Sequence, residues 1–198
     1  DGKAYSVMCA YNRFRGKACC GSDFMLDDIL RKKWGFEGYV VSDCGAITDI
    51  HAHHRIEPDA PAASSTGVKA GCDIECGSDY LSLVEAVKKG LISEEEINVS
   101  LRRVLMARFK LGLFDPPEMV PWAQIPISLN DCPEHRNLSV LSARESIVLL
   151  KNEKHTLPLS KNLSTLLVTG PNADNLDVLL GNYNGYPSKY VTLLQGIK

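Results

Sequence analysis

In the first half of the chain, short apolar runs alternate with longer stretches of helical periodicity. The runs predict strands at residues 7–11, 39–43 and 72–76. The stretches between and after them predict helices at residues 22–34, 60–69, 80–89 and 93–111. Ser22 is a candidate N-cap for the first helix, and Ser93 with Glu96 has the spacing of a capping box at the start of the last. This order of elements predicts a parallel α/β architecture.

The pattern changes after Phe114. Periodicity is lost up to about Pro133 and prolines accumulate, as in a linker on a protein surface. A helix is predicted at residues 133–146, followed by strands at residues 147–151 and 165–169. We therefore predict three parts: a first domain at residues 1–113, a linker at 114–133 and the beginning of a second domain at 134–198.

Composition and charge exclude several classes of protein. The 198 residues are 44% hydrophobic and 23% charged, as in a globular protein, and the net charge of -2 provides no basic face for nucleic acid. No apolar run approaches the roughly 20 residues needed to span a bilayer, so we expect no membrane insertion. A strand is predicted within the first residues, without an initiating Met or a leader, so we expect the chain to be an internal piece of a longer polypeptide.

The seven cysteines are many for a cytosolic enzyme, yet their odd number and irregular spacing fit no small disulfide scaffold. They favour an oxidising location, either extracellular or periplasmic. The N-terminus itself does not specify the compartment.

The first candidate for chemistry is Asp43, where the apolar strand 39–43 becomes polar. In α/β folds the carboxyl ends of the strands form the ligand site, and a rigid sheet can hold a carboxylate there at the mouth of a barrel. An Asp after a strand is more often a capping or loop residue. The strand pattern alone leaves both interpretations open.

Several stretches, in the same order, resemble glycoside hydrolase family 3. They are residues 7–12 (VMCAYN), 34–43 (WGFEGYVVSD), 70–75 (AGCDIE), 102–114 (RRVLMARFKLGLF) and 146–152 (SIVLLKN) with 170–174 (GPNAD). The resemblance implies the C-terminal part of a TIM-type (β/α) barrel, then a linker and the start of an α/β sandwich domain. It also implies that Asp43 is the nucleophile, with Tyr11 close to it in the sugar pocket.

In this family the activity implied is that of a retaining exo-β-glycosidase, which hydrolyses terminal non-reducing β-linked sugars from an oligosaccharide or aryl glycoside. Such enzymes need a second carboxyl group roughly 5 Å from the nucleophile as acid/base. The family's acid/base Glu lies beyond Lys198, and the earlier barrel strands are also absent. We therefore expect no turnover by this chain without the remainder of the parent polypeptide, which is its expected partner. No cofactor is implied.

Many β-glucosidases of the family have Trp directly after the nucleophile, whereas this chain has Cys44 directly after Asp43. In the xylosidase-like branch, Cys44 and Cys76 resemble a pair bonded across the pocket, where the hydroxymethyl group of glucose would sit. Two buried, unbonded cysteines are the alternative. The resemblance favours a β-xylosidase, with two alternatives: a β-glucosidase of the family, or a noncatalytic carbohydrate-binding relative.

Other polar residues receive simpler interpretations. We interpret His51, His53 and His54 as solvated residues near the pocket rim, and we predict no metal site because no partnered ligands have a defined spacing. Glu75 is a candidate substrate contact, with an ion-paired or capping role as the alternative. Asp73 lies between buried positions and is expected to be structural.

Overall fold

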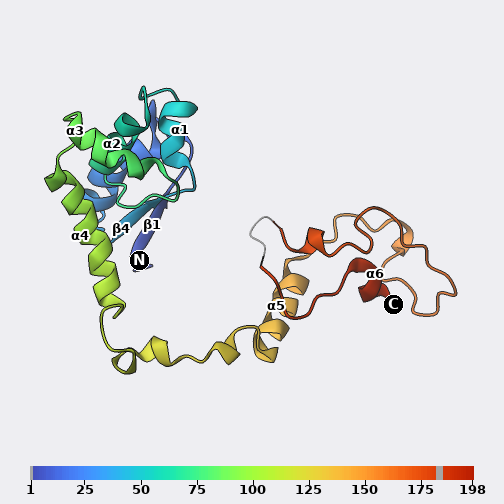
Figure 1. Cartoon of the computed structure of the whole chain (residues 1–198). Coiled ribbons are helices and arrows are strands. Elements are labelled where there is room, and N and C mark those ends of the chain that lie inside the picture. The colour runs from blue at the N-terminus through green and yellow to red at the C-terminus, as the bar shows by residue number, and fades with distance from the viewer. Residues whose placement is uncertain (1, 182–184) are drawn as a thin grey trace. The chain divides into compact units, whose positions relative to one another are not determined.

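The computed structural model describes residues 2–181 and 185–198 and divides into two compact units, Asp1–Pro121 and Trp122–Lys198. Each unit is described by itself, and Figure 1 labels their elements.

Unit 1 is built on a parallel pair of strands, β1 (Ser6–Cys9) and β4 (Tyr39–Ser42), which lie side by side in Figure 1. The register pairs Ser6 with Tyr39 and Cys9 with Ser42, so both strands end at the same edge. The third predicted strand, 72–76, is reduced to one parallel bridge between Val41 and Ile74. Because a strand needs a run of paired residues, the prediction is wrong in extent, although the segment does lie beside β4. The remaining strands, β2 (Arg13–Phe14) and β3 (Lys17–Ala18), form a short hairpin.

The helices of unit 1 are η1 (Cys19–Gly21), η2 (Phe24–Lys33), α1 (Ala46–Ala52), α2 (Ala60–Ala70), η3 (Asp79–Ser82), α3 (Leu83–Lys88), α4 (Glu94–Lys110) and η4 (Pro117–Met119). The predicted helical segments are present among them, whereas η1, α1 and η4 were not predicted. Helix α4 begins with the predicted capping box of Ser93 and Glu96. Helix η2 differs from the prediction in having π-type hydrogen bonds and Asp23 rather than Ser22 as its N-cap. Its buried residues, Leu26 and Leu30, recur at a spacing that an α-helix would share, so the apolar pattern could not show the difference.

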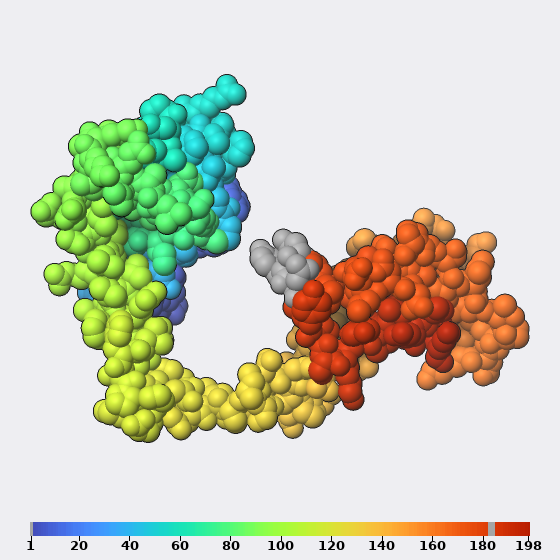
Figure 2. Space-filling view, in the orientation of Figure 1, coloured from blue at the N-terminus to red at the C-terminus, as the bar shows by residue number. Residues whose placement is uncertain are grey.

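The core of unit 1 lies between the sheet and the helices packed against it, both those that precede β4 and those that follow it. Val40, Ile47 and Ile50 have no exposed surface and belong to one apolar cluster. Gly38 precedes β4 at a point where a Cβ would lie 2.0 Å from the carbonyl oxygen of Tyr5, so this approach of the two strands requires glycine. Figure 2 shows the blue, cyan and green side chains of unit 1 packed into one body.

A buried carboxylate connects three elements of unit 1. The Asp73 side chain is completely inaccessible and accepts hydrogen bonds from Arg31 on η2 (2.6 Å), Arg103 on α4 (2.9 Å) and the backbone N–H of Val40 on β4 (2.9 Å). Burial lowers the pKa of Arg31, and the adjacent Asp73 carboxylate opposes this shift. Asp73 is therefore structural, as its sequence context predicted.

Unit 2 contains helices and irregular segments. They are η5 (Pro121–Gln124), whose first residue belongs to unit 1, and η6 (Ile127–Leu129), α5 (Pro133–Ser146), η7 (Glu153–His155), η8 (Asp177–Leu179) and α6 (Leu193–Ile197). Residues 147–151 and 165–169, predicted as strands, have no strand neighbour within the described part of unit 2. Leu150 and Leu167 are 92% and 83% exposed there. The prediction of strands is wrong, since an apolar run becomes a strand only where another segment pairs with it. Among the described residues of both units, no helix has the length and apolar character needed to cross a bilayer.

Candidate active site

Asp43 directly follows β4, at the edge where β1 also ends. Its backbone N–H donates to the carbonyl oxygen of Cys9 at 3.1 Å, which extends the contact between the two chain segments by one residue. Its Oδ1 accepts the backbone N–H of Cys44 at 2.7 Å, and the residue is partly exposed. The carboxylate thus follows the carboxyl end of a parallel strand, which is the end where α/β folds place their ligand sites, and the residue is partly exposed.

Tyr11 lies beside Asp43 through contacts with the next residue. The Tyr11 hydroxyl donates to the carbonyl oxygen of Cys44 at 2.7 Å, and the residue is 44% exposed. The backbone carbonyl oxygen of Tyr11 lies 2.7 Å from Nε2 of His54. Two hydrogen bonds therefore hold Tyr11 against the segment that carries Asp43.

Cys44 and Cys76 form a disulfide with a Cα–Cα distance of 4.4 Å, so the pairing implied by the family resemblance is present in the structure. Backbone bonds reinforce it: the Gly45 N–H donates to the Cys76 carbonyl at 2.7 Å, and the Cys76 N–H donates to Oγ of Ser42 at 3.0 Å. Gly45 has a φ of +81°, a conformation suited to glycine, and this turn directs the chain from the disulfide into α1. The disulfide thus lies next to the candidate nucleophile, and Cys44 is exposed.

Glu75 precedes Cys76, but both of its carboxylate oxygens are engaged by the following turn. Oε1 accepts from the Asp79 N–H at 3.1 Å and Oε2 from the Tyr80 N–H at 2.6 Å. Burial raises the pKa of Glu75, while these two hydrogen bonds act in the opposite direction. The structure therefore gives Glu75 a capping function, and its contact with substrate stays a prediction.

We expect the Glu75→Gln substitution to change how stability depends on pH. Because the pKa of Glu75 is raised in the folded protein, the folded state binds this proton more tightly than the unfolded state does. The contribution of Glu75 to stability is then greatest below its unfolded pKa of about 4.3 and declines as pH rises through the folded pKa. Urea unfolding at a series of pH values should show this decline in the unchanged protein and a flatter profile in Glu75→Gln. Glu85→Gln, at an exposed position, is the control, and parallel profiles for all three proteins would contradict the expectation.

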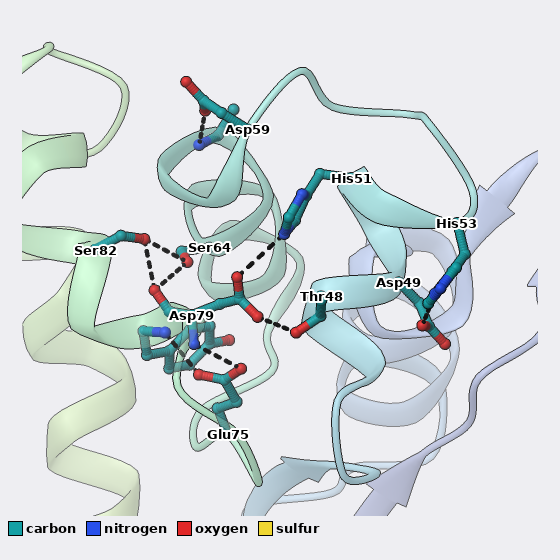
Figure 3. Close-up of polar contacts among 11 residues, drawn as sticks. Thr48, Asp49, His51, His53, Asp59, Ser64, Glu75, Asp79 and Ser82 are labelled. Carbon is teal, nitrogen blue, oxygen red and sulfur yellow. Dashed lines mark hydrogen bonds and ion pairs between the residues drawn. The ribbon is translucent and has the colours of Figure 1, made fainter.

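The three histidines contact different partners. His51 on α1 is partly buried, and its Nε2 lies 3.1 Å from Oδ1 of Asp79, whose other oxygen accepts the Thr48 hydroxyl (Figure 3). His53 pairs with Asp49 and is mainly exposed. The expectation that all three are solvated is wrong for His51, because the buried Asp79 side chain is positioned to accept from it. This network joins α1 to η3.

Sequence reasoning did not identify the contacts of His54 and Asp79. These contacts join residues that are far apart in the sequence: the separation is 43 residues for His54 and Tyr11, and 28 residues for His51 and Asp79. No local spacing marks such pairs. The position of Asp79 shortly after the strand-like segment 72–76 was the one signal available in the sequence.

Two family models match this chain. The model of the glycosyl hydrolase family 3 N-terminal domain matches residues 1–107, and that of the family's C-terminal domain matches residues 147–198. The chain belongs to glycosyl hydrolase family 3. Unit 1 accordingly has an α/β organisation consistent with the TIM-barrel-type N-terminal domain of this family.

Two curated relatives of this family 3 chain are named as xylosidases. A xylan 1,4-beta-xylosidase of Xylanibacter ruminicola is 46% identical over 200 residues, covering 100% of this chain and 23% of that protein. Beta-D-xylosidase 1 of Arabidopsis thaliana is 39% identical over 201 residues, covering 100% of the chain and 26% of that protein. The chain therefore spans about a quarter of the length of these relatives.

Solved structures of family 3 members show the same likeness. A GH3 exo-beta-xylosidase in complex with a xylobiose aziridine activity-based probe aligns with a TM-score of 0.84 and 35% identity over 99% of this chain and 26% of that one. A beta-glucosidase from Listeria innocua in complex with glucose aligns with a TM-score of 0.75 and 26% identity over 98% of this chain and 27% of that one. Both xylosidases and glucosidases are thus among the structural relatives.

Proposed function

We propose that this chain carries the nucleophile of a retaining exo-β-xylosidase, which removes terminal xylose from the non-reducing end of plant-type oligosaccharides. One observation carries the proposal: Asp43 directly follows a parallel strand and lies beside Tyr11 and the Cys44–Cys76 disulfide. The match of the whole of this chain to a part of proteins named as xylosidases supports the same substrate.

In this mechanism, Asp43 attacks the anomeric carbon while an acid elsewhere in the parent protein protonates the departing oxygen. The bond from the sugar to the leaving group breaks and a covalent glycosyl–Asp43 ester forms, which water then hydrolyses with the acid acting as base. The chain supplies the nucleophile, and the acid/base residue belongs to the remainder of the parent polypeptide. No step requires a cofactor.

The architecture is part of the proposal. Residues 1–113 form the C-terminal part of the barrel, residues 114–133 the linker, and residues 134–198 the start of the sandwich domain. The family matches to residues 1–107 and 147–198 support this division, as does the boundary between the two units at Pro121 and Trp122. The exposed apolar residues of unit 2 are then surfaces that the rest of the parent chain covers.

The disulfide is the basis for a pentose substrate. It occupies space beside the nucleophile where the hydroxymethyl group of a glucose would otherwise fit. A β-glucosidase is the second candidate, favoured by the structural likeness to the Listeria innocua enzyme. A noncatalytic relative, in which Asp43 only accepts hydrogen bonds from sugar hydroxyls, is an outcome of the test below.

Trapping of the glycosyl–enzyme intermediate tests the proposal. The parent protein is incubated with a 2-deoxy-2-fluoro-xyloside carrying a good leaving group, then digested, and the adduct is located by mass spectrometry. We expect the fluoroxylosyl group on the tryptic peptide 34–55, at Asp43. Turnover with the label on another residue would remove the nucleophile assignment. The absence of both turnover and label with this xyloside and with the matching 2-deoxy-2-fluoro-glucoside would indicate the noncatalytic relative.

A second prediction concerns substrate choice. In a Cys44→Ala/Cys76→Ala variant, the ratio of kcat/KM for aryl glucoside to that for aryl xyloside should rise about tenfold, because a pocket that loses a few atoms accepts a larger sugar better. Cys132→Ser in unit 2 serves as the control. A folded double variant with an unchanged ratio would exclude the disulfide as a determinant of specificity.

The proposal also locates the protein outside the cytoplasm, in the extracellular space or the periplasm. The two disulfides, Cys9–Cys20 and Cys44–Cys76, support an oxidising compartment.

A further inference from the structure

Three buried sulfur atoms lie together under the ends of the strands. Cys9 at the end of β1 is bonded to Cys20 in η1, and the sulfur of the unbonded Cys72 lies 3.8 Å from that of Cys9. All three sulfurs lie within 4.8 Å of one another, and the residues are 5%, 1% and 0% exposed respectively. A thiol is therefore in contact with a disulfide inside the apolar core.

Cys72 is held firmly in this place. Its N–H donates to the carbonyl of Gly67 at 3.0 Å, and its carbonyl accepts the hydroxyl of Tyr80 at 2.8 Å. Its thiol lies 3.6 Å from the carbonyl oxygen of Ile74, close enough to donate a weak hydrogen bond. With both backbone groups fixed, the contact with Cys9 follows from how the chain leaves α2 and approaches β4.

We propose that Cys72 is a second disulfide partner of Cys9, so that the end of β1 carries an exchangeable cross-link. In the exchange, the Cys72 thiol loses its proton and the sulfur attacks Cys9. The Cys9–Cys72 bond forms, the Cys9–Cys20 bond breaks, and Cys20 leaves as a thiolate that takes up a proton. One disulfide and one thiol are present before and after, so no oxidant or reductant is needed.

Burial makes this exchange slow. It raises the pKa of Cys72 to about 12, with smaller contributions in the same direction from Asp73 and Glu75 and an opposing one from Tyr80. The thiolate is the attacking species, so little of it is available near neutral pH. The three sulfurs also form a triangle rather than a line, so a side chain must turn before the attack. The two cross-linked forms should therefore persist separately at neutral pH.

The two cross-links hold different parts of unit 1. The Cys9–Cys20 bond, with a sequence separation of 11, closes a loop that contains Tyr11 and the β2–β3 hairpin. A Cys9–Cys72 bond would release that loop and fasten β1 to the segment on the other side of β4. Release of the loop would free Tyr11 and could thereby change substrate affinity, an effect that rests on the proposed function. The alternative cross-link itself does not depend on that function.

The direct test uses a Cys19→Ser/Cys20→Ser variant of the full-length protein, which removes the observed partner and its neighbour. After folding in a glutathione redox couple, free thiols are blocked with N-ethylmaleimide, and the protein is digested with trypsin and with a protease that cleaves after Glu. We expect residues 4–13 to be disulfide-linked to residues 70–75. An N-ethylmaleimide adduct on Cys9 in folded protein, or a Cys9 bond to any other cysteine, would overturn the proposal.

The exchange itself is tested in the unchanged protein held at mildly alkaline pH before blocking. With longer incubation, the N-ethylmaleimide adduct should be found increasingly on Cys20 and decreasingly on Cys72. The rate of this exchange should rise about tenfold for each pH unit below the pKa of Cys72. The Cys44–Cys76 bond in the same digest is the internal control. Exchange confined to the three-cysteine cluster supports the proposal. No exchange, or scrambling that includes Cys44 and Cys76, would overturn it.

Discussion

In the full-length protein, Asp43→Asn is expected to lower kcat for an aryl xyloside by about 10⁴-fold or more, since loss of a covalent nucleophile removes the reaction path itself. Asparagine keeps the size of the side chain and can still accept the Cys44 N–H. Folding should therefore be unchanged. Initial rates, with thermal unfolding measured on the same samples, check both expectations.

A smaller side chain at position 43 tests the nucleophile assignment in a second way. Asp43→Gly leaves space for azide, which should restore part of the activity and yield a xylosyl azide of inverted configuration, because it attacks from the face that Asp43 occupied. Asp49→Asn is the matched control, since this nearby carboxylate pairs with His53 and lies outside the proposed chemistry. A loss of activity in Asp49→Asn equal to that in Asp43→Asn, with no azide product from Asp43→Gly, would refute the nucleophile assignment.

The second large effect is on stability. Asp73→Asn should lower the free energy of unfolding by about 3–5 kcal/mol, because it leaves the guanidinium of Arg31, whose side chain is 10% exposed, without its counter-charge. Arg103 is 27% exposed and can regain water. Arg103→Met should therefore cost less than Asp73→Asn. Urea unfolding monitored by circular dichroism gives both values.

Asp28→Asn provides the comparison for Asp73→Asn. Asp28 pairs with Lys32 on the exposed face of η2, and its own side chain is 53% exposed, so water replaces the lost partner. Equal destabilisation by Asp28→Asn and Asp73→Asn would show that burial of the Asp73 carboxylate does not determine its contribution.

The parts of the fold that the sequence predicted are those whose signals are local. Helix α4 begins at the Ser93 and Glu96 capping box, and α2 coincides closely with the predicted 60–69 helix. Strand β4 was marked by its apolar run. In each case neighbouring residues supply both the stabilising contacts and the pattern that reveals them.

The incorrect predictions concern strands that depend on distant partners. Residues 147–151 and 165–169 have the composition of buried strands, but no pairing segment occurs in the described part of unit 2. The segment 72–76 does lie beside β4, but its pairing is limited to a single bridge between Val41 and Ile74. Apolar composition indicates that a segment is suited to a sheet, whereas pairing decides whether it becomes a strand.

The candidate site was likewise predicted only in part. Asp43 and the Cys44–Cys76 pair were indicated by likeness to a family, and the structure adds the hydrogen bonds that join Tyr11 to Cys44 and His54 to Tyr11. The Cys9–Cys20 disulfide was not predicted, because seven cysteines at irregular spacing allow many pairings. Its partners are fixed by the position of η1 over the end of β1.

The two disulfides differ in their access to solvent, with a practical consequence for purification. Cys44 is exposed, whereas Cys9 and Cys20 are buried, so a mild thiol reagent reaches the pocket bond before the core bond. Buffers containing dithiothreitol would then give folded protein in which the Cys44–Cys76 bond is reduced and the Cys9–Cys20 bond is intact. Sugar preferences measured on such preparations would describe the reduced form rather than the native one.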